Sequence, residues 1–156
     1  TAADFDNDGF VDVYITALGP NRLFKGQGDG HFVDVTREAG VADPGFSTSA
    51  LWLDYDEDGH LDLFVGNYVE WSAETDLFCP FVDDAKSYCT PESYQGQSPT
   101  LYHNQGNGTF EDTSVEAGVT MGRWAWGSPF VDINNDGRPD LLVANGYITG
   151  EDTNDL

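Results

Sequence analysis

Short apolar runs alternate along the chain with acidic and glycine-rich segments. Three runs directly follow an acidic segment, at residues 13–15, 63–65 and 141–143. Short runs rich in β-branched and aromatic residues are typical of buried strands. Two further runs, at residues 50–53 and 128–131, lead into the second and third acidic segments and are expected to be strands as well. The hydrophobic pattern therefore predicts an all-β fold.

Two glycine-rich segments predict tight hairpins. Residues 26–30 read Gly-Gln-Gly-Asp-Gly and residues 104–108 read Asn-Gln-Gly-Asn-Gly, each between two segments that carry aromatic residues. Closely spaced glycines in that setting are a strong hairpin signal. Residues 37–41 and 115–119 share the sequence Glu-Ala-Gly-Val and are expected to form no more than one helical turn.

An internal repeat organises the chain. Residues 23–54 align with residues 101–132 without a gap. About four strands per repeat, with 50 residues from the first acidic segment to the second, match one blade of a β-propeller, which is a four-stranded antiparallel sheet. The matching positions include Leu23/Leu101, Gln27/Gln105, Gly28/Gly106, Gly30/Gly108, Phe32/Phe110, Asp34/Asp112, Glu38/Glu116, Ala39/Ala117, Gly40/Gly118 and Val41/Val119.

We therefore expect a single partial propeller domain over residues 1–156, with about three blades at approximately residues 1–46, 47–123 and 124–156. The second interval between acidic segments is 78 residues long, so 28 residues have been inserted. The insertion, at residues 69–99, contains three prolines and has no counterpart in the repeat. Closed propellers typically have four to eight blades. The chain is therefore expected to belong to a larger propeller or to have its open edges covered by neighbouring chains.

The acidic segments share the nine-residue pattern D-x-[DN]-x-D-G-x-x-D, at residues 4–12, 54–62 and 132–140. Side-chain oxygens at positions one, three, five and nine, together with the main-chain carbonyl at position seven, would give the six to eight oxygen ligands that Ca²⁺ favours. The glycine at position six permits the positive φ that turns the backbone. The candidate ligands are Asp4, Asp6, Asp8, Phe10, Asp12, Asp54, Asp56, Asp58, His60, Asp62, Asp132, Asn134, Asp136, Arg138 and Asp140.

About three structural Ca²⁺ ions are expected on this basis. The acidic segments contain no Cys and no clustered His, which disfavours zinc and copper, and Mg²⁺ would demand octahedral geometry. An EF-hand is excluded because it requires Glu at position twelve, where this chain has Ile15, Val65 and Val143. Acidic turns without metal are the simpler alternative, and three copies in register argue against it. The third acidic segment, residues 132–140, should bind Ca²⁺ most weakly because Asn134 replaces a carboxylate.

The charge of the chain limits its partners. With 28 acidic and 6 basic residues, the formal net charge is -22. Nucleic acid is excluded as a partner because phosphate binding requires a basic surface. Adhesion to anionic membranes is disfavoured for the same reason. No stretch approaches the roughly 20 apolar residues of a membrane span, so direct membrane insertion is not expected.

These motifs carry a resemblance to a known family. The acidic loops with apolar strands on either side resemble FG-GAP and VCBS-type repeats, the calcium-binding blades of integrin α-subunit propellers. The hairpin sequence of residues 101–119 and the apolar segment after the third loop resemble the ASPIC/UnbV (cartilage acidic protein-like) group. The Phe-Gly and Gly-Ala-Pro strings that gave FG-GAP its name do not occur as such. The resemblance implies a secreted or cell-surface propeller used for binding, with Ca²⁺ in the blade loops.

The insertion contains both cysteines, Cys79 and Cys89. A disulfide between them would stabilise the insertion by about 3 kcal/mol, and the alternative is a pair of reduced thiols. The disulfide is favoured because calcium sites of this kind need the millimolar Ca²⁺ found outside cells, where disulfides persist. Asn107 begins an Asn-Gly-Thr sequon and is a possible glycosylation site.

Three of the four tryptophans are expected to be packing residues and not ligand-binding residues. Trp52, Trp124 and Trp126 precede acidic loops and are expected to pack between blades rather than to form a sugar-stacking platform. Tyr68 and Trp71, at the start of the insertion, are better candidates for a binding surface.

No catalytic site is expected. The three histidines, His31, His60 and His103, are scattered and lie in no nucleophile motif. The leading hypothesis is a calcium-binding extracellular propeller module for adhesion, ligand binding or assembly, with a protein, a glycan or copies of itself as partner. The alternatives are a filament subunit whose blades are completed by neighbouring chains and the propeller part of a secreted carbohydrate-active enzyme.

Overall fold

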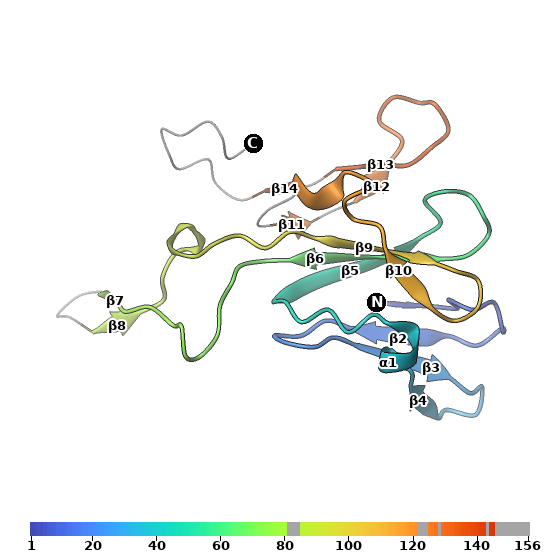
Figure 1. Cartoon of the computed structure of the whole chain (residues 1–156), viewed down its shortest axis with the longest axis horizontal. Helices are drawn as coiled ribbons and strands as arrows, with labels where there is room; N and C mark the ends of the chain where they lie inside the picture. Colours follow the sequence, from blue (N-terminus) through green and yellow to red (C-terminus); the bar gives the residue numbers. More distant parts are fainter. Residues whose placement is uncertain (81–84, 122–124, 128, 143, 146–156) are drawn as a thin grey trace.

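A computed structural model describes residues 1–80, 85–121, 125–127, 129–142 and 144–145 (Figure 1). Its main elements are antiparallel strands, and its one α-helix among the described residues has four residues. The predicted roles of Trp124, Val143 and the Trp126 side chain lie outside the described residues. No helix in the described ranges is long and apolar enough to cross a membrane.

The first sheet is a four-stranded meander. Its strands are β1 (Ala2–Ala3), β2 (Asp12–Ile15), β3 (Arg22–Gly26) and β4 (Phe32–Asp34), each antiparallel to the next. Residues 4–11 connect β1 to β2, and the predicted glycine-rich hairpin connects β3 to β4. The predicted helical turn is α1 (Thr36–Ala39), which ends at Gly40 with a φ of 80°.

The second sheet repeats this arrangement. Its strands are β5 (Ser47–Leu53), β6 (Asp62–Asn67), β9 (Thr100–Asn104) and β10 (Phe110–Asp112), again antiparallel in this order. The 3₁₀ turn η3 (Val119–Met121) follows, close to the second predicted helical turn. The two sheets confirm the all-β class and the four-stranded antiparallel blades.

The third acidic loop connects two short antiparallel strands. β12 (Phe130–Val131) pairs with β13 (Asp140–Leu141), and β11 (Ala125–Gly127) pairs with β14 (Ala144–Asn145). This antiparallel arrangement around residues 132–139 corresponds to β1 and β2 around the first loop, so the chain begins a third sheet in the same way.

The insertion projects between β6 and β9. It contains the short strands β7 (Cys79–Pro80) and β8 (Lys86–Ser87) and the 3₁₀ turn η2 (Pro91–Ser93). Cys79 and Cys89 form a disulfide, which confirms the predicted pairing. Figure 1 shows the β7–β8 hairpin at one end of the sheets and the three acidic loops at the opposite end.

The hydrophobic core lies between the two four-stranded sheets. Phe5 from the first loop and Tyr14 from the first sheet meet Trp52 from the second sheet, with ring centroids 6.0 and 6.3 Å from the Trp52 ring. Trp52 is only 9% exposed, so it packs between blades as predicted. The Tyr14 hydroxyl donates a hydrogen bond to the carbonyl of Val41 at 2.8 Å, which satisfies the one polar group of that side chain. The other buried members of this core are Leu23, Ala39, Val41, Leu63, Val65 and Tyr102.

Asn104 ties the two sheets together beside the acidic loops. Its side chain is 2% exposed, and Nδ2 donates to the carbonyls of Phe5 and Leu61, both at 2.9 Å. Phe5 belongs to the first loop and Leu61 to the second. Asn7 Nδ2 also donates to the carbonyl of Gly59 at 3.2 Å, so the first two loops lie side by side.

Candidate metal centres

The three acidic loops, named loop 1 (residues 4–12), loop 2 (54–62) and loop 3 (132–140), have the same backbone. The glycine at position six has a φ of 88–90° in each, as expected. Position four is also left-handed, with φ of 59–63° at Asn7, Glu57 and Asn135. This second left-handed residue was not predicted, although the asparagines at two of the three positions favour it. Two positive-φ residues within three positions turn the chain sharply enough to bring alternate side chains together.

The first aspartate of each loop closes the turn. Its Oδ1 atom accepts a hydrogen bond from the main-chain N–H of position five at 3.0 Å in all three loops. Its Oδ2 atom accepts one from the N–H of the glycine at 2.8–3.0 Å. The aspartate at position five accepts from the N–H of position seven at 2.8–2.9 Å. The loop conformation is therefore fixed by local hydrogen bonds, and each oxygen retains a lone pair for a further ligand.

Carboxylates converge in loops 1 and 2. Oxygen atoms of Asp4, Asp6 and Asp8 lie within 4.8 Å of one another, and those of the corresponding Asp54, Asp56 and Asp58 do the same. The Oδ1 atom of Asp6 is buried and accepts no hydrogen bond from the described residues. A buried oxygen without a donor is costly, and like charges this close repel. A cation bound between the carboxylates would remove both penalties, so the donor set fits a hard metal ion.

The closing aspartate is buried under each of these two loops. Asp12 and Asp62 are fully buried. Oδ2 accepts from the N–H of Phe5 at 3.0 Å in loop 1 and of Tyr55 at 3.1 Å in loop 2. Oδ1 accepts from the third strand of each blade, at the N–H of Gly26 or Asn104, at 2.8 Å in both. This aspartate therefore joins the loop to the sheet.

Burial raises the pKa of Asp12 and Asp62 above the ordinary aspartate value, and the main-chain N–H donors oppose that shift. The main-chain hydrogen bonds therefore offset only part of the free-energy cost of burying the charged carboxylates. A nearby cation would favour the ionised form further.

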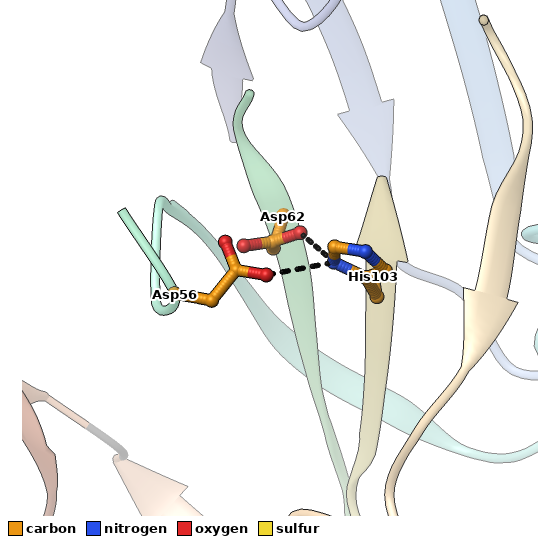
Figure 2. A group of neighbouring side chains, drawn as sticks. All are labelled: Asp56, Asp62 and His103. Atoms are coloured by element: carbon orange, nitrogen blue, oxygen red, sulfur yellow. Dashed lines mark hydrogen bonds and ion pairs between the residues drawn. The ribbon is translucent and has the colours of Figure 1, made fainter. Parts of the chain in front are cut away.

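A basic side chain on the third strand reaches each of these loops. Lys25 Nζ contacts Asp6 Oδ2 and lies 2.9 Å from Asp8 Oδ2. These contacts raise the pKa of Lys25 and hold that of Asp8 below its usual value. His103 holds the equivalent position in the second blade, as Figure 2 shows: Nδ1 lies 3.1 Å from Asp62 Oδ1 and 3.5 Å from Asp56 Oδ2.

Sequence reasoning did not identify either basic residue as part of a site. The gapless alignment of the two repeats places Lys25 and His103 at one position. The chain has few basic residues, so the presence of one at the same position in both repeats could have indicated that this position belongs to the site.

In loops 1 and 2, the side chain at position seven packs on the neighbouring hairpin. The Phe10 ring lies against Gly28, where an added Cβ would come within 2.2 Å of the ring. His60 lies against Gly106 in the same way, with 2.7 Å to an added Cβ. A Cβ at either hairpin glycine would therefore displace the side chain at position seven, and it would also strain a backbone with positive φ. The side chain at position seven packs on the hairpin, as expected if only its main-chain carbonyl were available to an ion.

Loop 3 has the same hydrogen bonds within the loop, with one carboxylate fewer. Asp140 Oδ2 accepts from the N–H of Ile133 at 3.0 Å, and Asn134 Nδ2 donates to Asp136 Oδ2 at 3.0 Å. This amide N–H group thus partly stabilises the carboxylate of Asp136 in the absence of a cation.

The possible glycosylation site, Asn107, is exposed in the hairpin that follows β9, and its Oδ1 accepts from the Thr109 hydroxyl at 2.7 Å.

Known proteins share these repeats. The model of the FG-GAP-like repeat family matches residues 4–65 and 87–143. Human cartilage acidic protein 1 is 45% identical over 51 residues, which are 32% of this chain and 8% of that protein. The mouse protein of the same name is 47% identical over 49 residues, which are 29% of this chain and 7% of that protein. The chain thus spans less than a tenth of the length of the curated relatives that it matches.

Both matched segments of the family model contain acidic loops, and most of the residues between them, 66–86, fall in the insertion. The family match, the repeated loops and the two equivalent four-stranded sheets agree in covering most of the chain. The chain therefore belongs to the FG-GAP-like repeat family, and its sheets are blades of a β-propeller.

Proposed function

We propose that loops 1, 2 and 3 bind Ca²⁺ and that the ions stabilise the blades. The observation that carries this proposal is the convergence of carboxylates in a repeated, hydrogen-bonded turn, with the buried Asp6 oxygen left without a donor. The residues that would hold the ions are the aspartates at positions one, three, five and nine, with Asn134 in loop 3. The main-chain carbonyls of Phe10, His60 and Arg138 would complete the oxygen ligands.

The donor set favours Ca²⁺ over other common ions. Carboxylate, amide and carbonyl oxygens suit hard cations. Ca²⁺ accepts six to eight such ligands in flexible geometry, whereas Mg²⁺ needs a near-ideal octahedron and retains several waters. His103 is the one imidazole within the loop clusters of the described residues, and a site with a single nitrogen donor among carboxylates is a poor match for zinc or copper.

The proposed role of the metal is structural, in a non-catalytic extracellular protein. Each ion would join a loop to the sheet through the buried closing aspartate, and thereby brace two neighbouring strands. The disulfide of the insertion supports an oxidising compartment. Millimolar Ca²⁺ outside cells would fill sites in the affinity range of extracellular modules. Adhesion, ligand binding or assembly would then be performed by surfaces that this scaffold holds in place.

Calcium affinity should depend on position five of the loop and not on the side chain at position seven. Asp8→Ala removes a ligand from loop 1, so titration calorimetry is expected to detect one site fewer. Phe10→Ala keeps the main-chain carbonyl and is expected to leave the number of sites unchanged. An unaltered isotherm for Asp8→Ala, or loss of a site in Phe10→Ala, would contradict the assignment.

Lys25 is expected to weaken calcium binding at loop 1. Its ammonium group contacts two of the candidate ligands and must lose these contacts, or remain close to the ion, when Ca²⁺ binds. Lys25→Met keeps the apolar stem and removes the charge, so affinity at loop 1 should rise about tenfold, equivalent to about 1.4 kcal/mol. Lys86→Met, which alters a lysine of the insertion, is the matched control and should leave calcium affinity at loop 1 unchanged. Equal or lower affinity in Lys25→Met would show that the lysine does not compete with the ion.

A further inference from the structure

The insertion forms a cavity at the end of the molecule opposite the acidic loops. Its volume is about 690 Å³, within the range of small-molecule sites. The aromatic side chains of Phe46, Tyr68, Trp71 and Tyr94 line it, together with the charged pair Asp76 and Lys86. The cavity uses none of the residues of the candidate metal centres.

The walls of this cavity are held in position by their own contacts. Asp76 Oδ1 accepts hydrogen bonds from Trp71 Nε1 at 3.1 Å and from the Tyr94 hydroxyl at 3.2 Å. Asp76 Oδ2 pairs with Lys86 Nζ. The rings of Tyr68 and Trp71 pack on Phe46, with centroids 5.6 and 6.4 Å apart. The Cys79–Cys89 disulfide crosslinks the segment that carries Lys86, so the aromatic surface is preorganised.

The charges in and around the cavity disfavour charged ligands. Asp76 and Lys86 neutralise each other, so a cationic ligand would have to displace Lys86 from the carboxylate. The net charge of -22 repels anions, including sulfated sugars and phosphates. The ligand class that remains is neutral, has apolar faces for the aromatic rings, and carries hydroxyl groups for the charged pair.

We propose that this cavity binds a neutral saccharide. The aromatic faces would contact the C–H faces of a pyranose ring, since Trp and Tyr supply rigid contact area with a polar edge. Asp76 would accept hydrogen bonds from sugar hydroxyls and Lys86 would donate to them. Their side chains are 30% and 50% exposed, so both can be reached from solvent. A few convergent polar groups in a largely apolar cavity are the usual composition of a specific site.

Saturation-transfer NMR on the whole chain in calcium tests the proposal. The probes are neutral oligosaccharides of glucose, galactose, mannose and N-acetylglucosamine, with choline and a sulfated disaccharide as charged comparators. At least one neutral sugar is expected to bind with a Kd of about 1 mM or below, and Trp71→Ala should weaken binding at least tenfold. Phe78→Ala is the matched control, because Phe78 is 62% exposed in the same insertion and lies outside the cavity lining.

Three results would overturn the proposal. They are no binding by any neutral sugar, binding that survives Trp71→Ala, and binding of choline alone, which would identify an aromatic site for cations. The melting temperature of Trp71→Ala should stay within a few degrees of the parent chain. If it does not, Tyr94→Phe, which removes only the hydroxyl that contacts Asp76, is expected to weaken sugar binding, and unchanged affinity in that variant would count against the proposal. Because the metal loops lie at the other end of the sheets, failure here leaves the calcium assignment untouched.

Discussion

Chelation of calcium with EGTA is expected to lower the melting temperature of the chain by about 10–20 °C. A site with a Kd of about 0.1 mM, typical of extracellular modules, contributes about 2 kcal/mol of stability at about 2 mM Ca²⁺. Three such sites would contribute about 5 kcal/mol together, and each kcal/mol shifts the melting temperature of a domain of this size by about 2–4 °C. Restoring Ca²⁺ in excess should restore the transition.

The ion dependence of this shift identifies its cause. Magnesium at the same concentration is expected to restore only part of the lost stability, because the loops offer more oxygen ligands than an octahedral ion accepts. Sodium chloride at matched ionic strength controls for screening of the net charge of -22. A melting temperature that is indifferent to EGTA, or equal recovery in sodium chloride, would contradict a structural role for Ca²⁺.

Asp62→Ala and Asp58→Ala are expected to lower stability in different ways. Asp62 is fully buried and accepts hydrogen bonds from the main-chain N–H groups of Tyr55 and Asn104. Its removal leaves both donors unpaired, so the free energy of unfolding should fall by about 2–4 kcal/mol even in EGTA. Asp58 is exposed, and the main-chain N–H of His60 that donates to it at 2.8 Å is also exposed and can bond to water instead. Its substitution should therefore cost about 2 kcal/mol in calcium, mainly through lost metal ligation, and less than about 0.5 kcal/mol in EGTA.

Urea denaturation of both variants, in calcium and in EGTA, measures these four differences. Asp62→Asn keeps the side-chain shape and one acceptor oxygen, so it should be less harmful than Asp62→Ala in EGTA. If Asp58→Ala lost as much stability in EGTA as in calcium, loop 2 would be a structural turn without a metal. If Asp62→Ala lost none in EGTA, the closing aspartate would not join the loop to the sheet.

The features that could be predicted from the sequence are those that depend on residues close together in the chain. The loop glycines, the hairpins at residues 26–30 and 104–108 and the turn at α1 are determined by local backbone preferences, and all appear where the pattern predicts them. The gapless repeat also predicted two equivalent four-stranded sheets. The pairing of Cys79 with Cys89 required no choice, since the chain has only two cysteines.

Contacts between distant segments were not predictable from the pattern. Lys25 contacts loop 1 because β3 pairs with β2, and His103 contacts loop 2 because β9 pairs with β6. The hydrogen bonds of Asn104 to both loops require the two sheets to pack face to face. The left-handed conformation at Glu57 is set by the loop as a whole, because glutamate has no preference for it.

Native mass spectrometry of the whole chain in a calcium-containing volatile buffer tests the central claim most directly, by counting bound ions. We expect three Ca²⁺ ions per chain at saturation, with the last filled at loop 3. Asp8→Ala and Asp58→Ala should each retain two, and the double variant one. A parent chain without bound Ca²⁺, or a double variant that retains three ions, would contradict the assignment of the repeated loops as calcium sites.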